Sequence, residues 1–199
     1  MTCIVAIVSD NGSIVMGSDT AASNEDIVHI YKKTKIFTKT SNAAGSAALT
    51  VAPQETFLIG FSGSFRNAQI VEYDFEVPSR PYGITTMEYM VSYFVRDLRK
   101  ALKKSEALEV VNGVCSFDCE LIVAYRGHLF TIMSDFHVAE MEQNYSCIGS
   151  GSQAALGALY ALKGDGCYTA YDSAHIALEA AEASTTSVCG PFHIVETYY

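Results

Sequence analysis

The feature that most limits how this chain can fold is an apolar hairpin that begins directly behind its first two residues. Residues 3–9 (CIVAIVS) and 13–19 (SIVMGSD) are rich in β-branched side chains and flank the pair Asn11-Gly12. An Asn-Gly pair between two apolar runs is the strongest short-range signal for a tight β-turn. The pattern predicts two antiparallel strands, so the start of the chain lies in a sheet, whereas chain ends usually fray.

The rest of the sequence alternates strands with pairs of helices. A polar connection over 20–34 and a flexible loop over 41–54 separate the first strands, and apolar residues at helical spacing then mark the helices. The predicted strands are 35–40, 56–62, 119–125, 128–134, 145–149 and 191–198, and the predicted helices are 64–75, 85–104, 152–163 and 172–184. Runs of strands between helix pairs indicate an α+β fold of antiparallel sheets, and 199 residues fit a single domain over 1–199.

Composition and charge exclude several classes of partner. The chain carries a net charge of −9, which repels nucleic acid and anionic membranes. It has no secretory signal pattern and no apolar run of about 18 residues to span a bilayer, so we expect a cytoplasmic protein. Its six cysteines lack paired C-x-x-C spacing, which indicates reduced thiols. The histidines show no metal-ligand spacing, and we expect neither a metal nor an organic cofactor.

Thr2 is the residue whose position suggests chemistry. Removal of Met1 would give Thr2 both a hydroxyl and a free α-amine. An N-terminal amine has a pKa of about 7.7–8.0, so it can act as the base that a weakly nucleophilic hydroxyl requires. A nearby lysine would lower the pKa of that amine by like-charge repulsion, and a carboxylate would keep the lysine charged and in place.

A carboxylate and a lysine are expected near Thr2. Asp19 follows the second strand, and in an antiparallel hairpin that end lies beside Thr2. Lysines follow at Lys32, Lys33 and Lys35. Lys35 starts the next apolar strand, and a third strand beside the first two would bring its side chain to the same end of the sheet.

The ordered set TCIVAI, GSD, TKIF, GFSGS and IGSGS resembles the proteasome β-subunit family, the N-terminal-nucleophile hydrolases that include the bacterial HslV peptidase. The resemblance spans nearly the whole chain. It implies a four-layer αββα sandwich, in which two antiparallel sheets lie between helix pairs. It also implies a homo-oligomeric ring, or stacked rings, that hydrolyses unfolded polypeptides without a cofactor. By analogy, an ATP-dependent unfoldase would supply those polypeptides.

The resemblance also implies roles for particular residues. The N-terminal nucleophile corresponds to Thr2 and the strand-end aspartate to Asp19. The catalytic lysine corresponds to Lys35, because Lys35 follows Asp19 by 16 residues, the separation found in the family, whereas Lys33 follows it by 14. These three residues form the predicted nucleophilic centre.

The resemblance assigns supporting roles to four further residues. The glycine whose backbone N–H stabilises the oxyanion corresponds to Gly63, and the serine that supports the N-terminal amine corresponds to Ser150. The late Asp-x-x-Ser element of the family has Glu182 and Thr185 at the matching interval, with both residue types changed.

Two other functions are compatible with the same sequence. A catalytically silent ring subunit would retain Met1 and serve assembly or interaction. An amidase would use the same N-terminal nucleophile on a small amide, and a pocket open to solvent in the assembled particle would favour it. Phe61 and Phe65 fall where the family lines its substrate pocket, although core packing of aromatic residues would give the same pattern.

Overall fold

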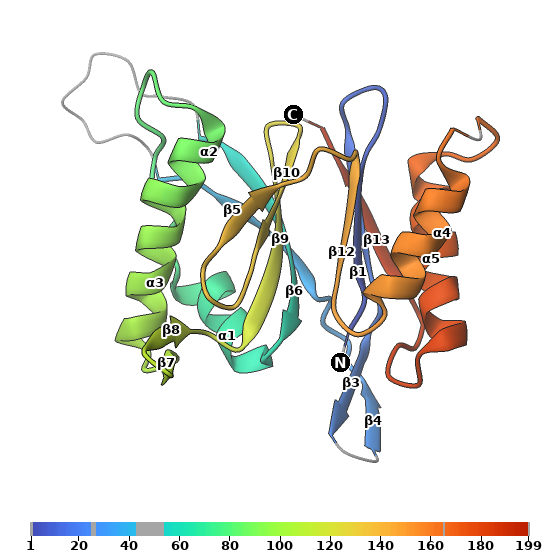
Figure 1. Ribbon diagram of the computed structural model, residues 1–199, viewed down its shortest axis with the longest axis horizontal. Helices are drawn as coiled ribbons and strands as arrows, with labels where there is room; N and C mark the ends of the chain where they lie inside the picture. The colour runs from blue at the N-terminus through green and yellow to red at the C-terminus, as the bar shows by residue number, and fades with distance from the viewer. Residues whose placement is uncertain (1, 25–26, 43–53, 165, 199) are drawn as a thin grey trace.

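In the computed structural model, two antiparallel sheets lie side by side in the middle of the molecule, with helices on either flank (Figure 1). The structure describes residues 2–24, 27–42, 54–164 and 166–198. The mixed α/β class with antiparallel sheets, which the sequence predicted, is confirmed. The predicted loop over 41–54 falls almost entirely outside the described residues.

The predicted N-terminal hairpin forms the centre of a four-stranded sheet. Its strand order is β12-β1-β2-β13, with bounds β1 Ile4–Val8, β2 Ile14–Ser18, β12 Tyr145–Ile148 and β13 His193–Thr197. Gly12 adopts a φ of +82° in the turn, a conformation that favours glycine. Because Ile4 pairs with Ser18, the start of β1 and the end of β2 lie at the same edge.

The second sheet has five strands in the order β11-β10-β9-β6-β5. Their bounds are β5 Ile36–Thr40, β6 Thr56–Gly63, β9 Cys119–Tyr125, β10 His128–Ile132 and β11 Val138–Glu140. The expectation that residues 35–40 continue the first sheet was wrong, because β5 pairs with β6. The first two residues of β5 are apolar and pack on opposite faces of the sheet: Ile36 packs between the sheets, and Phe37 packs toward the helices.

Two short ribbons were not predicted. One consists of β3 Ala21–Asn24 and β4 Ile27–Ile30, in place of the expected polar connection. It projects beyond the edge of the sheets at which the chain begins (Figure 1). The other consists of β7 Glu109–Val111 and β8 Val114–Ser116. Its turn is Asn112-Gly113, with φ of +53° and +80°, the same residue pair that signalled the first hairpin.

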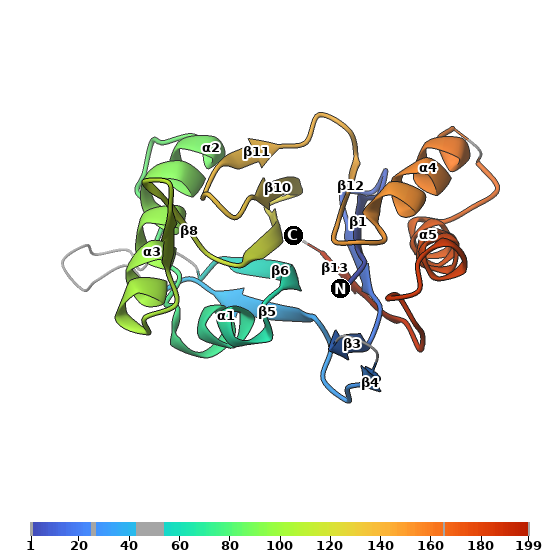
Figure 2. The ribbon, with the colours of Figure 1, turned by 60° about the horizontal axis from the view of Figure 1, so that its bottom comes forward.

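Two groups of helices cover the outer faces of the sheets (Figure 2). The first group is α1 Phe65–Gln69, a π-helical turn η1 Ile70–Asp74, α2 Thr86–Tyr89, a second π-helical turn η2 Met90–Phe94, and α3 Val95–Lys104; the second is α4 Ser152–Leu162 and α5 Ala170–Ser184. Side-chain oxygens of Ser64, Thr85 and Thr169 cap α1, α2 and α5. No helix within these described segments is long and apolar enough to cross a membrane.

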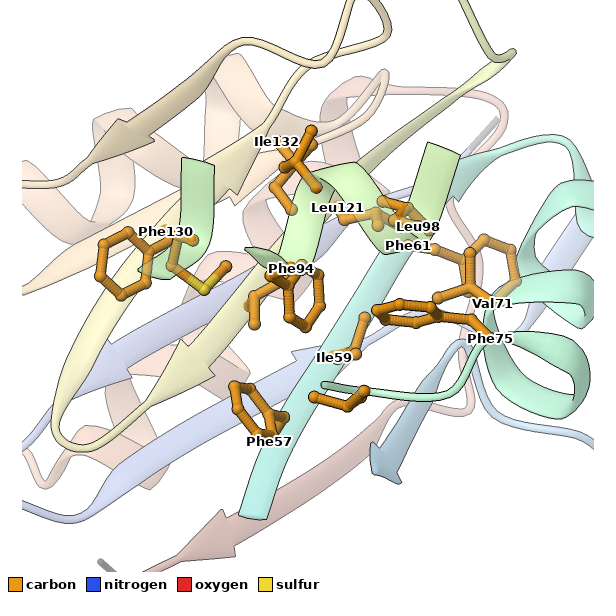
Figure 3. Close-up of a cluster of buried hydrophobic side chains, with 14 of the residues drawn as sticks. Phe57, Ile59, Phe61, Val71, Phe75, Phe94, Leu98, Leu121, Phe130 and Ile132 are labelled. Atoms are coloured by element: carbon orange, nitrogen blue, oxygen red, sulfur yellow. The ribbon is translucent and has the colours of Figure 1, made fainter. Parts of the chain in front are cut away.

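Three apolar clusters join these elements. Figure 3 shows the cluster between the five-stranded sheet and the first helix group, where Phe57, Phe75 and Phe94 are nearly inaccessible to solvent. A second cluster packs α4 and α5 on the four-stranded sheet. The third lies between the sheets and includes Ile4 and Ile36. The strand ends that carry Thr2 and Lys35 are therefore fixed by apolar packing of the sheets against each other.

Candidate active site

Thr2, Lys35 and Asp19 form a chain of hydrogen bonds inside the protein. Lys35 Nζ donates to Thr2 Oγ1 at 2.9 Å and to Asp19 Oδ1 at 2.8 Å. Thr2 and Lys35 are 1% exposed and Asp19 is 0% exposed. Long charged side chains are rarely this buried unless they are paired. The arrangement places a cation against a hydroxyl and fixes that cation with a carboxylate.

The hairpin register orients Asp19. Its backbone N–H donates to Cys3 O at 3.3 Å, and its carboxylate accepts from Cys3 N at 2.9 Å and from Ala21 N at 3.2 Å. With Lys35 as a third donor, the two carboxylate oxygens have fixed directions. The carboxylate therefore positions the lysine rather than turning toward solvent.

Lys35 reaches the site from the other sheet. It lies immediately before β5, and its main-chain oxygen accepts from Phe61 N of β6 at 3.1 Å. Burial lowers the pKa of the Lys35 ammonium below its ordinary value, and the negative charge of Asp19 opposes that shift. The sequence analysis expected Lys35 on a neighbouring strand of the same sheet, but the side chain instead meets Thr2 where the two packed sheets adjoin.

The main chain of Thr2 is attached to the turn that follows β12. Thr2 N donates to Ser150 Oγ at 3.2 Å, and Gly151 N donates to Thr2 O at 3.2 Å. Ser150 Oγ also lies 3.3 Å from Thr2 O and 3.0 Å from Ser187 Oγ. The Ser150 hydroxyl therefore contacts the Thr2 nitrogen, the atom that would be the α-amine of a processed chain, and Ser187 contacts the Ser150 hydroxyl in turn.

Gly149 lets this turn approach Thr2 closely. Its φ is +93°, and a Cβ atom there would lie 2.2 Å from Thr2 O and 2.8 Å from Ser62 Oγ. A side chain at this position would be strained and would also displace the Thr2 carbonyl. The same contact shows that the end of β6, which carries Ser62, lies near Thr2.

Gly63 is the last residue of β6. Its φ is +113°, and a Cβ atom there would lie 2.5 Å from Asp118 O. Phe61 N, two residues earlier, donates to Lys35 O at 3.1 Å. The end of β6 that carries Gly63 therefore lies close to the segment before β5, where Lys35 lies.

The structure does not bring Glu182 to Thr2. Glu182 is exposed on α5, and its carboxylate accepts from Gly190 N at 2.8 Å. Thr185 is the C-cap residue of α5, and its carbonyl accepts from Val188 N. Ser187, which the sequence analysis missed, is 3% exposed and contacts Ser150. The run of hydroxyl residues 184–187, which begins at the last residue of α5, was the available signal for it.

A cavity of about 540 Å³ lies beside the segment that precedes Lys35. Its lining includes Lys33 and Thr34, which precede Lys35, and the aromatic side chains of Phe61 and Phe65. Another cavity, of about 840 Å³, lies at the β1–β2 turn, at the opposite end of those strands from Thr2. Among the described residues, no group of histidine, cysteine, aspartate and glutamate side chains is arranged to bind a metal ion.

Comparison with known proteins gives relatives by structure and not by sequence. No protein-family model matches the sequence, and no curated protein sequence matches it. BPH from Thiobacillus denitrificans, solved in complex with epoxomicin, superposes with a TM-score of 0.75 at 18% identity, over 98% of this chain and 97% of that chain. Eukaryotic HslV from Trypanosoma brucei gives 0.63 at 19% identity, over 99% of each chain.

The helical assembly of the Anbu complex from Pseudomonas aeruginosa contains a third similar chain, with a TM-score of 0.62 at 15% identity, over 98% of this chain and 81% of that chain. These neighbours share the proteasome-like N-terminal-nucleophile hydrolase fold. At identities of 15–19%, the likeness establishes that this chain has the same fold. Its chemistry has to be argued from its own residues.

Proposed function

We propose that this chain is a threonine-type peptidase subunit of a proteasome-like ring, with Thr2 as the nucleophile once Met1 is removed. The observation that carries the proposal is the buried chain from Thr2 Oγ1 through Lys35 Nζ to Asp19. A buried ion pair is costly to desolvate, and such pairs are found more often at functional sites. The contact of this pair with a hydroxyl next to the N-terminus supports a catalytic role for the three residues. Met1 itself lies outside the described residues.

The reaction divides into acylation and hydrolysis of the acyl-enzyme. The Thr2 hydroxyl transfers its proton to the free amine of the same residue, and its oxygen attacks the peptide carbonyl. The Lys35 ammonium lowers the proton affinity of that amine and favours the alkoxide. The protonated α-amine gives its proton to the nitrogen of the departing amine as the C–N bond breaks, which leaves an ester on Thr2. A water molecule then attacks this ester, the α-amine takes a proton from the water and returns it to Thr2 Oγ1, and the acyl product leaves as a carboxylic acid.

The surrounding residues have supporting roles in this proposal. Ser150 and Ser187 orient the amine of Thr2, since Thr2 N donates to Ser150 Oγ and the two serine hydroxyls lie 3.0 Å apart. The Gly63 N–H binds the oxyanion, and losing such a donor elsewhere costs about 2.7–4 kcal/mol of transition-state stabilisation.

The proposal extends to architecture and partners. In this proposal residues 1–199 form one peptidase domain, and its architecture is a four-layer αββα sandwich, which the two adjoining sheets with helices on their outer faces support. The fold shared with HslV and with Anbu, which forms a helical assembly in Pseudomonas aeruginosa, supports self-association of this chain, and in this proposal the copies close into a homo-oligomeric ring or stacked rings. If Thr2 faces an enclosed chamber, the substrates are unfolded polypeptides and an ATP-dependent unfoldase delivers them.

The first experiment is to measure the intact mass of the purified chain before and after reaction with an epoxyketone, which requires both a threonine hydroxyl and a free amine. Loss of one methionine and a single adduct on Thr2 support the proposal. Thr2→Ala is the matched control and gives no adduct. Retained Met1 without an adduct would favour the silent ring subunit. Hydrolysis of small amides but not of polypeptides would favour the amidase.

A further inference from the structure

Helix α3 concentrates positive charge that the proposed mechanism does not use. Five of the 13 lysine and arginine residues of the chain lie between Arg96 and Lys104, with Asp97 as the single acidic residue among them. This segment therefore has a net charge of +4, which leaves −13 for the rest of a chain whose total is −9. The field around α3 is thus opposite in sign to the field of the molecule as a whole.

Two of these charges lack a carboxylate partner in the described part of the chain. The apolar residues of α3, such as Leu98 and Leu102, are buried toward the five-stranded sheet. Arg99 and Lys103 are exposed and four residues apart, so they lie in one row on the outer side of the helix. The ion pairs of α3 go to Asp97, and neither Arg99 nor Lys103 is in one.

This row forms one wall of a groove of about 560 Å³. Arg99, Lys100 and Lys103 line it from α3, and the ribbon β7–β8 lines it from the other side. Figures 1 and 2 both show β8 beside α3. Val110 and Cys115 face the groove from the ribbon, where they are paired across the two strands and so share one face.

The wall formed by the ribbon presents apolar surface to solvent. Val110 is 71% exposed, and Val114, in the other strand of the ribbon, is 54% exposed. An isolated two-stranded ribbon is only marginally stable in water. A partner that covered Val110 would remove apolar surface from water at the place where it also meets the charges of α3.

We infer that this groove is a docking site for an acidic segment of another protein, whose carboxylates pair with Arg99 and Lys103 and whose apolar side chain covers Val110. The groove is lined by three cations and one carboxylate, that of Glu106, so its net charge is +2. Charge complementarity of this kind selects an acidic partner over a basic one. A nucleic acid or an anionic membrane would be repelled by the charge of −13 on the rest of the chain.

Arg99 is held in place before a partner binds. Its guanidinium carbon lies 5.0 Å from the centre of the Phe136 ring, and Phe136 is buried in the apolar cluster beneath the first helix group. A guanidinium over an aromatic face retains its N–H donors for a carboxylate. The inference goes beyond the proposed peptidase function, because the groove is not lined by Thr2, Asp19 or Lys35.

The test is the binding of three fluorescein-labelled peptides, measured by fluorescence anisotropy with the Thr2→Ala chain so that the peptides are not hydrolysed. Glutamates alternate with leucines in the first peptide, glutamates alternate with serines in the second, and lysines alternate with leucines in the third. The glutamate-leucine peptide should bind most tightly. Its dissociation constant should rise about tenfold between about 0.05 M and about 0.5 M salt, because the Debye length shortens.

Variants of α3 and of the ribbon locate the binding. Arg99→Gln with Lys103→Gln should raise the dissociation constant of the glutamate-leucine peptide about tenfold. Arg96→Gln with Lys104→Gln is the matched control, since it removes two charges of the same helix that do not line the groove, and it should change the constant by less than about twofold. Val110→Ser should weaken binding of the glutamate-leucine peptide and leave that of the glutamate-serine peptide unchanged.

Three results would overturn the inference. Absence of binding by the glutamate-leucine peptide would do so directly. Equal binding of the two glutamate peptides, or equal weakening in the two double variants, would show attraction by charge alone. A lower native mass of Arg99→Gln with Lys103→Gln would show that the groove receives a second copy of this chain. The proposed function keeps its own test in every case, the epoxyketone adduct on Thr2.

Discussion

At the scale of single residues, the proposed chemistry depends on the Thr2 hydroxyl. Thr2→Ala removes Oγ1, the atom to which Lys35 Nζ donates, so we expect hydrolysis to fall by more than about 1,000-fold. Thr2→Ser retains a hydroxyl and should retain measurable activity. Peptide turnover and the thermal unfolding temperature of each variant test this, and full activity of Thr2→Ala would refute the mechanism.

The two neighbouring lysines should differ sharply. Lys35→Ala removes the cation beside Thr2 and leaves Asp19 buried without its lysine, which should abolish hydrolysis and lower the free energy of unfolding by about 3–5 kcal/mol. Lys33→Ala changes an exposed side chain and should alter peptide turnover only mildly. Peptide turnover and chemical denaturation of both variants test this prediction. If Lys33→Ala loses more activity than Lys35→Ala, the assignment of Lys35 as the catalytic lysine is wrong.

Cys3, next to Thr2, should make stability fall at high pH. Burial raises the pKa of its thiol to about 12, and the charge of Asp19 adds to the shift. Above an ordinary thiol pKa of about 8.5, the unfolded chain releases the Cys3 proton while the folded chain retains it. The stability that the Cys3 thiol contributes is therefore complete below that pH and is lost as the pH rises toward 12. In this pH range the free energy of unfolding of the native chain should fall as the pH rises. Its slope should exceed the slope measured for Cys3→Ala by up to about 1.4 kcal/mol per pH unit.

At the scale of elements, the turn after β12 depends on one glycine. Gly149→Ala would place a Cβ atom 2.2 Å from Thr2 O, so we expect loss of activity together with a lower unfolding temperature. Gly127→Ala is the control, because Gly127 also has a positive φ, +79°, but a Cβ atom there meets nothing within 4 Å. If the two variants lose activity equally, backbone strain rather than the contact with Thr2 explains the effect.

The same elements show what a sequence can and cannot predict. The β1–β2 hairpin was predictable because its turn and its apolar alternation are local, and locality also placed Asp19 beside Thr2. The sheet that the strand after Lys35 joins could not be predicted in this way, because the local patterns of β5 and β6 are compatible with either sheet. Ser187 was missed because its contact with Ser150 spans 37 residues and depends on how α5 ends.

At the scale of the whole molecule, the proposed ring requires contact surfaces on more than one part of the chain. Charged residues are only 18% of the chain. Large side chains are exposed at widely separated places, including Tyr82 at 105% and Tyr160 at 73% relative exposure. Aromatic side chains are enriched at protein interfaces, where charged residues are depleted. These side chains lie on different elements, so one chain would present more than one contact surface, as closure of a ring requires.

The assembly itself is the last prediction. We expect a native mass that is a multiple of the 21.6 kDa chain, measured by sedimentation or native mass spectrometry. Because the exposed side chains named above are apolar or aromatic, the assembly should persist at 1 M salt, where the Debye length falls to about 3 Å. Thr2→Ala should assemble identically, since Thr2 is 1% exposed and its hydroxyl contacts Lys35 of the same chain. A 21.6 kDa particle at micromolar concentration would refute the ring and leave the chemistry of Thr2 to be judged by its epoxyketone adduct.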